Sequence, residues 1–311
     1  MKNQKVLYGI IIAFCVVAII SGIYAQFFVK DKNQNKNNIE ENNVVVEEKT
    51  QEETERELLS KLTNKLNNLE YKNENIKKIK NEENFVYTYK TINKKTDKYE
   101  ININLPMINI DEEIPNKFNK ITKDIFEAKA NSIVNNENIE NTILNTKYSA
   151  NIKNNILSVI IEVTLKEGNK PQQVAIQTYN YNLETKQEAK FLDILSSNEI
   201  IQSDAKNKIL KTIKEEKKKA DVLAESGYLV YDRDLDDKKY ILENINNYFI
   251  DEQNNIYAIF AYGNQIRTSE KDIVVFENKN KENGNKENSN NEINNKEENT
   301  IKNNTNNEER E

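Results

Sequence analysis

The sequence predicts an α+β fold in which antiparallel sheets are each packed with a single long helix, preceded by one transmembrane helix. Three observations support this prediction. Pairs of segments with alternating apolar residues are separated by short polar turns, which is typical of β-hairpins. These segments are grouped around two apolar stripes of helical spacing instead of alternating strictly with them, which favours α+β architecture. A long uncharged segment precedes all of them.

The transmembrane helix is expected at residues 6–29. This run contains no charged residue and exceeds the roughly 20 residues that a helix needs to cross a bilayer. Lys2 and Lys5 make the preceding end, residues 1–5, basic. The apolar run is longer than that of a typical signal peptide, and Ile23 is large for a cleavage site after Ala25, so we expect an uncleaved anchor, with cleavage there as the alternative. The expected protein crosses the cell membrane once, with residues 1–5 cytoplasmic and the C-terminal part extracytoplasmic.

Residues 30–83 are expected to form a polar linker followed by a stalk helix. The linker is rich in Asn and Glu. Leu58, Leu62, Leu66 and Leu69 then recur at intervals of three and four residues, which predicts one apolar stripe of a helix. Such a helix is either a stalk with a short coiled coil or a helix packed on its own domain.

An N-terminal α+β subdomain is predicted for residues 84–170. Alternating residues at 85–89 and 99–105 predict a hairpin, and 147–152 with 156–165 predict a second hairpin turning at Asn154 and Asn155. Pro115 suits the first turn of a helix between them. The residues expected on its buried face are Phe118, Ile121, Ile125, Ala128 and Ile133.

A C-terminal α+β subdomain is predicted for residues 171–277. It begins with a strand at 173–183, followed by a helix through Ile213 that Ser197 or Asn198 is expected to cap. Residues 248–250 and 256–262 predict a hairpin, and 273–276 a closing strand. Residues 278–311 are almost entirely Asn, Glu and Lys, and we expect this tail to be disordered.

Composition excludes several kinds of catalytic and metal site. The chain has no histidine, and its single cysteine, Cys15, lies in the expected membrane span. Ser-His-Asp and Cys-His catalysis, and zinc sites built from His or Cys, are therefore excluded in the domain. No carboxylate pair stands out as a general acid and base, so we expect no enzyme. The net charge is −6 and the lysines are scattered among acidic residues, which argues against nucleic acid as a partner.

Two sets of residues are candidates for binding. Tyrosine combines a large aromatic face with a polar tip, so a groove for a glycan or a protein is one interpretation of the tyrosines, and ordinary core packing is the other. The tyrosines are Tyr179, Tyr181, Tyr228, Tyr231, Tyr257 and Tyr262.

A calcium loop is the second candidate. Asp232, Asp234, Asp236 and Glu243 occupy positions 1, 3, 5 and 12 of an EF-hand spacing. Asp237 stands at position 6, where the sharp turn of that loop needs Gly. The alternative is a solvated acidic loop without a metal, and no other cofactor is expected.

Three segments carry a resemblance to a known family: residues 104–109 (NLPMIN), residues 179–186 (YNYNLETK) leading to 191–195 (FLDIL), and residues 248–251 (YFID). With them, the chain resembles the extracytoplasmic region shared by RsiV-type anti-sigma factors and PdaC-type peptidoglycan deacetylases of Gram-positive bacteria. The resemblance covers residues 84–277. That family commonly has a Gly-Gly-Ala-His-like segment where residues 167–173 here contain no His. Neither the sigma-binding part nor the deacetylase domain is expected.

The function expected from these observations is that of a non-catalytic, membrane-anchored binding module at the cell envelope. The bilayer is its partner through residues 6–29, and peptidoglycan or an envelope protein is the ligand considered. One alternative is a sensor or regulatory subunit of the anti-sigma type that signals through a partner. The other is a cell-wall hydrolase or deacetylase lacking His.

Overall fold

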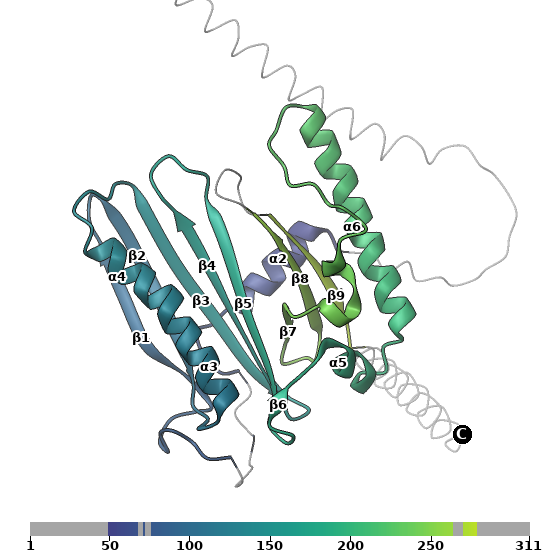
Figure 1. Ribbon diagram of the computed structural model, residues 1–311, viewed down its shortest axis with the longest axis horizontal. Helices are drawn as coiled ribbons and strands as arrows, with labels where there is room; N and C mark the ends of the chain where they lie inside the picture. Colours follow the sequence, from purple (N-terminus) through teal and green to yellow (C-terminus); the bar gives the residue numbers. More distant parts are fainter. Residues whose placement is uncertain (1–48, 68–70, 72–75, 264–269, 279–311) are drawn as a thin grey trace, which may run out of the picture. The chain divides into compact units, whose positions relative to one another are not determined.

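The computed structural model describes residues 49–67, 71, 76–263 and 270–278, which form two β-sheets and the helices around them (Figure 1). The expected transmembrane helix at 6–29 and the tail from residue 279 lie outside the described residues. None of the helices within the described ranges combines the length and the apolar character that a membrane span requires.

The first sheet, sheet A, has six strands in the order β1 to β6. The strands are β1 (Val86–Lys95), β2 (Tyr99–Ile108), β3 (Thr142–Lys153), β4 (Ile156–Lys166), β5 (Gln173–Asn182) and β6 (Gln187–Glu188). The predicted hairpins β1–β2 and β3–β4 are confirmed. Asn154 and Asn155 have φ of 49° and 63°, which are the left-handed conformations that a tight hairpin turn requires.

Sheet A is mixed, which corrects the expectation of purely antiparallel sheets. β2 and β3 run parallel, whereas the other neighbouring strands are antiparallel. A parallel pair needs a crossover connection, and here the chain crosses through a helical segment between the two strands. β5 pairs with β4 along its whole length, so the expected subdomain boundary between residues 170 and 171 falls between two paired strands of one sheet.

The helical segment between β2 and β3 covers one face of sheet A (Figure 1). It consists of α3 (Glu113–Thr122), the π-helical turn η1 (Lys123–Glu127) and α4 (Ala128–Val134). Phe118 and Ile133 are buried as predicted, but Ile121 and Ile125 are 47% and 53% exposed. Ala128 is exposed as well, and the buried face instead follows Thr122, Phe126 and Ala130, one or two positions after the predicted residues.

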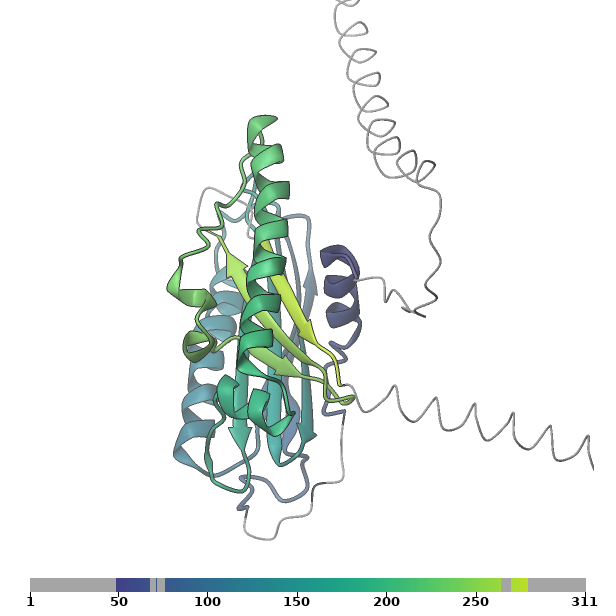
Figure 2. The ribbon, with the colours of Figure 1, turned by 90° about the vertical axis from the view of Figure 1, so that its right-hand side faces the viewer.

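The second sheet, sheet B, is antiparallel and consists of β7 (Tyr248–Ile250), β8 (Ile256–Tyr262) and β9 (Glu270–Phe276). One face packs on α5 (Phe191–Ser197) and α6 (Gln202–Glu225), and Figure 2 shows α6 lying along the sheet with its C-terminal end beyond the strands. The predicted caps were wrong: Ser197 ends α5, Asn198 is its C-terminal cap, and α6 begins after Ile201. Three-residue 3₁₀ turns, η2 (Lys238–Tyr240) and η3 (Leu242–Asn244), follow α6.

The predicted stalk helix is short and packs on its own domain, which was the second of the two interpretations. It is α2 (Gln51–Ser60), which begins with a capping box between Thr50 and Glu53. Leu58 and Leu62 are buried against the other face of sheet B, beside Phe249. The helix ends at Ser60, and the irregular chain after it carries Leu62 and Leu66 into the core, whereas Leu69 lies outside the described residues.

Polar side chains of sheet A bond to the backbone of β7. The Ser158 hydroxyl accepts a hydrogen bond from the backbone N–H of Ile250 at 2.9 Å. The Asn180 amide donates to the carbonyl of Tyr248 at 2.8 Å, and the Asn151 amide donates to the carbonyl just after β7, also at 2.8 Å. Ser158 and Asn180 also bond to each other at 2.6 Å. Sheet B is thus held to sheet A by directed hydrogen bonds as well as by apolar packing.

Candidate functional site

The six tyrosines predicted as a groove do not share one surface. Tyr179 and Tyr181 are buried between sheet A and the helices that cover it. The ring of Tyr179 lies 4.7 Å from that of Phe118, centroid to centroid. Burial raises the pKa of Tyr179 far above its usual range. These two residues follow the core interpretation, and their alternation with Leu183 on one strand face is the sequence signal for it.

The other four tyrosines divide between the interior of sheet B and the surface. Tyr257 is buried on the face towards α2, and Tyr262 is buried on the opposite face, towards α6. Tyr228 is 65% exposed just after α6. Tyr231 is half-buried, with its ring 5.4 Å from that of Tyr262. A common binding groove for the six is therefore not formed.

The carboxylates of the predicted calcium loop do not converge. Asp232 accepts a hydrogen bond from the Lys217 ammonium at 2.8 Å, and this bond lowers the pKa of Asp232. Asp234 accepts from the backbone N–H of Asp236 at 3.1 Å. The 3₁₀ turn η2 lies between Asp236 and Glu243, and Glu243 is itself part of η3, so the segment does not form an EF-hand loop. Across the described ranges, no group of three or more carboxylates is arranged to hold a metal ion.

The same loop supplies a buried cation that the sequence reasoning missed. Arg233 is 6% exposed and donates to both carboxylate oxygens of Asp272, at 2.8 and 3.0 Å. The hydroxyl of Tyr262 donates to Asp272 at 2.9 Å, and the hydroxyls of Tyr240 and Tyr262 are 2.6 Å apart. Each of these polar groups has a partner inside the protein. The network fixes the loop after α6 onto β9 and leaves no group free for a ligand.

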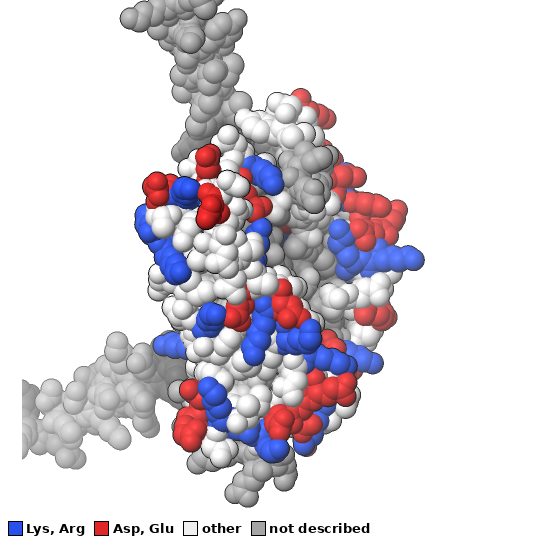
Figure 3. All heavy atoms as spheres, turned by 60° about the vertical axis from the view of Figure 1, so that its left-hand side comes forward, with Lys and Arg blue, Asp and Glu red and all other residues white. Residues whose placement is uncertain are grey.

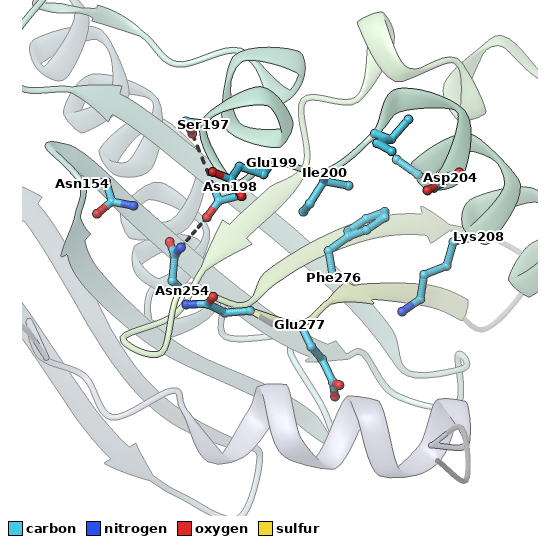
Figure 4. A pocket seen from close by; sticks show the side chains of 13 residues that line it. Asn154, Ser197, Asn198, Glu199, Ile200, Asp204, Lys208, Asn254, Phe276 and Glu277 are labelled. Carbon is cyan, nitrogen blue, oxygen red and sulfur yellow. Dashed lines mark hydrogen bonds between the residues drawn. The ribbon is translucent and has the colours of Figure 1, made fainter. Parts of the chain in front are cut away.

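A polar pocket of about 370 Å³ lies where the β3–β4 and β7–β8 turns meet the junction between α5 and α6 (Figure 4). The Asn254 amide donates to the side-chain oxygen of Asn198, whose own amide donates to the carbonyl of Ile194 at 2.8 Å. Figure 4 shows Asn254 and Asn198 facing each other on one side of the pocket, with Lys208 on the other side. Its central asparagines are thus used to hold the turns to the helices.

A second hollow, of about 480 Å³, lies between β1, β2 and α3, and we call it the lysine–tyrosine groove. Tyr87 and Tyr89 both line it from β1, at the point where the register of β1 with β2 shifts between Thr88 and Lys90. The residues that line it are Ile79, Lys80, Tyr87, Tyr89, Met107, Asn116, Asn119, Lys120 and Lys123. This groove is the candidate functional site.

Lysine ammonium groups lie over both tyrosine rings of the groove. The Lys80 nitrogen is 5.1 Å from the centroid of the Tyr87 ring, and the Lys123 nitrogen is 5.3 Å from that of Tyr89. Both distances are within the range of a cation–π interaction. The Tyr89 hydroxyl donates to Glu127 at 2.6 Å, which fixes the position of the ring.

The floor of the groove is held by one asparagine. Asn119 of α3 both accepts from the backbone N–H of Ile108 and donates to its carbonyl, each at 2.8 Å. This pair of bonds pins α3 to the end of β2. The irregular chain that carries Lys80 is held at the same end by Asn109, whose side chain accepts from the backbone N–H of Lys80 at 2.8 Å and donates to its carbonyl at 2.7 Å.

The charge of the groove is opposite to that of the whole chain. Its lining contains three lysines and no carboxylate, although the net charge of the chain is −6. Figure 3 shows the side of the molecule that carries β1 and α3, where basic side chains form a band next to uncharged surface, with acidic side chains interspersed. The sequence showed Tyr87 and Tyr89 only as alternating strand residues, because Lys123 joins them from a distant segment and Lys80 from the irregular chain before β1.

Comparison with known proteins adds little to this geometry. No protein-family model matches the sequence, and no curated protein matches it at a significant level. Among solved structures, the chain is similar to a crystal structure of a member of the DUF3298 family from Bacteroides fragilis. The two are 11% identical, the match covers 58% of this chain and 85% of that chain, and the TM-score is 0.26. A likeness of this degree carries no argument about fold or function.

Proposed function

We propose that the chain is a non-catalytic binding module that acts at the cell envelope, anchored by residues 6–29 with its C-terminal domain outside the cytoplasm. The observation that supports binding is the lysine–tyrosine groove. The groove brings exposed ammonium groups together with half-buried aromatic rings. Because these side chains are already ordered, they lose little conformational entropy when a ligand binds.

The chemistry of the described carboxylates also favours binding over catalysis. The two buried aspartates, Asp251 and Asp272, are each engaged by a cation. Lys61 lies 2.8 Å from Asp251, and Arg233 lies 2.8 Å from Asp272. A carboxylate held in this way is a poor general acid or base, because its lone pairs are occupied by donors of the protein. With no His in the chain, other routes to acid–base catalysis are few.

Binding to purified peptidoglycan sacculi tests the proposed function. The full chain in mild detergent is mixed with sacculi and sedimented, and the supernatant is analysed for released muropeptides, new reducing ends and acetate. We expect saturable co-sedimentation and no released product. Release of product would favour the hydrolase or deacetylase alternative. Absence of binding to sacculi would overturn peptidoglycan as the ligand.

A pair of tyrosine variants assigns the binding to the groove. Tyr87→Leu removes a hydroxyl and an aromatic face inside the groove, and we expect weaker binding to sacculi. Tyr228→Leu makes the same change at a residue that is 65% exposed outside the groove, and we expect unchanged binding. The proposed location is tested separately by adding protease to intact cells, which should cleave the C-terminal domain.

A further inference from the structure

We propose that the lysine–tyrosine groove binds an anionic glycan polymer, with Lys80 and Lys123 contacting its acidic groups. This inference rests on the proposed function, because it assigns a ligand class to the same groove. The acidic groups are phosphates or carboxylates, which are the anions that lysine ammonium groups bind through charge-assisted hydrogen bonds.

The first argument is that Lys80 and Lys123 are not neutralised as other lysines are. Neither forms an ion pair with a carboxylate in the part of the chain that the structure describes. Glu127 interacts with the charge of Lys123, but its oxygens already accept bonds from Lys90 at 2.5 Å and from Tyr89 at 2.6 Å. Several exposed lysines of the same region do pair with carboxylates: Lys77, Lys95, Lys117 and Lys120.

The second argument is that the two ammonium groups are held in place before any ligand arrives. Each lies over a tyrosine ring, so the flexible lysine side chain is partly ordered. Ordering a lysine side chain on binding otherwise costs on the order of 1 kcal/mol. An anion therefore meets two ammonium groups that are already positioned over two tyrosine rings of β1.

The third argument concerns specificity. The chain has a net charge of −6, so most of it repels a polyanion. The groove differs because three lysines and no carboxylate line it. Ile79, which is 48% exposed, and Met107 add apolar contact suited to the C–H faces of sugar rings. β1 is the first strand of sheet A and has a neighbour on one side only, so a polymer can continue past the groove.

Three polymers and two double variants test the inference with the full chain in mild detergent. The probes are phosphorylated dextran, polygalacturonate and neutral dextran, with affinities measured by calorimetry at two salt concentrations. We expect binding to one or both anionic polymers, weakening with salt, and none to dextran. Lys80→Gln with Lys123→Gln should weaken binding roughly tenfold, as the loss of two exposed charge contacts would give. Both lysines are exposed, so the fold should persist, which circular dichroism checks.

The control is Lys94→Gln with Lys147→Gln, which removes the same charge from exposed strand positions outside the groove. It should change affinity less than twofold. An equal loss in both double variants, or equal binding of dextran, would overturn the inference. Binding to the phosphate polymer alone or to the carboxylate polymer alone would support it and identify the acidic group. If sacculi are still bound and the Lys80/Lys123 variant binds them unchanged, the inference fails while the proposed function stands.

Discussion

Replacing Arg233 with Met tests how strongly the loop after α6 depends on one buried ion pair. Asp272 is buried and has three donors: two nitrogens of Arg233, at 2.8 and 3.0 Å, and the hydroxyl of Tyr262, at 2.9 Å. Met has a similar length and keeps much of the apolar contact of the arginine stem. The substitution therefore removes two of the three donors and leaves the carboxylate buried.

The magnitude follows from two independent estimates. A hydrogen bond to a charged group contributes about 1.5–3 kcal/mol, so two such bonds amount to about 3–6 kcal/mol. Measured losses after removal of one partner of a buried pair are about 3–5 kcal/mol. We therefore expect Arg233→Met to lower the free energy of unfolding by about 4 kcal/mol. Adding Asp272→Leu should restore part of the loss, because the uncompensated buried charge is then absent.

Urea unfolding of the full chain in mild detergent measures this loss, with the near-ultraviolet circular dichroism of the tyrosines as the signal. Arg56→Met is the matched control, because Arg56 is paired with Glu52 on the exposed surface of α2, where such pairs contribute about 0–1 kcal/mol. If Arg233→Met costs less than about 1 kcal/mol, like the control, the buried pair does not anchor the loop and the reasoning is wrong.

Three further predictions use the same unfolding assay. The Tyr179 hydroxyl is buried without a hydrogen-bond partner among the described residues, so Tyr179→Phe should leave stability unchanged or raise it by about 1 kcal/mol, and a clear loss would reveal a partner. Leu58→Ala should lower the free energy of unfolding by about 2–5 kcal/mol, because Leu58 is buried under sheet B. The control is Leu223→Ala, which should change it by no more than about 0.5 kcal/mol because Leu223 is 45% exposed. Equal effects of the two substitutions would mean that α2 does not pack on the sheet. The bond from Lys90 lowers the pKa of Glu127, so the stabilisation from the Glu127 carboxylate is present above the unfolded pKa of about 4.3 and is lost as the pH falls through the lower folded value. Glu127→Gln should therefore be destabilising at pH 7 and lose that effect in acid. A difference in stability that does not depend on pH would contradict this.

Local features of the fold could be predicted from the sequence because local spacing determines them. The turn at Asn154 and Asn155 needs left-handed residues, which asparagine tolerates. The alternation along β4 places Leu157, Val159, Ile161 and Val163 in one core, while Ile156 and Ile160 are buried on the opposite face. The parallel pairing of β2 with β3 depends on contacts between distant segments, and no local spacing encodes it. The buried face of the helix over sheet A was partly missed because Ile121 and Ile125 are apolar but exposed, whereas the neighbouring Thr122 and Phe126 occupy the buried positions.

The candidate site was less accessible to prediction for a similar reason. Tyr179 and Tyr257 have the residue type of a binding groove, but burial is decided by which face of a strand meets a helix or another sheet. Arg233 looked like part of an acidic loop, and only the fold brings Asp272 to it from β9. Lys80 and Tyr87 are near in sequence, whereas Lys123, in η1, joins them only when the helical segment between β2 and β3 packs on sheet A.

The bonds from Ser158, Asn180 and Asn151 to β7 have a consequence for assembly and cooperativity. An open strand edge is a template on which a strand of another molecule can add, and here side chains of the neighbouring sheet already occupy those backbone groups. The same bonds fit only one alignment of β7, since a shift by one residue would exchange the opposite faces that carry Tyr248 and Phe249. Sheet B should therefore neither recruit a foreign strand at this edge nor melt separately from sheet A.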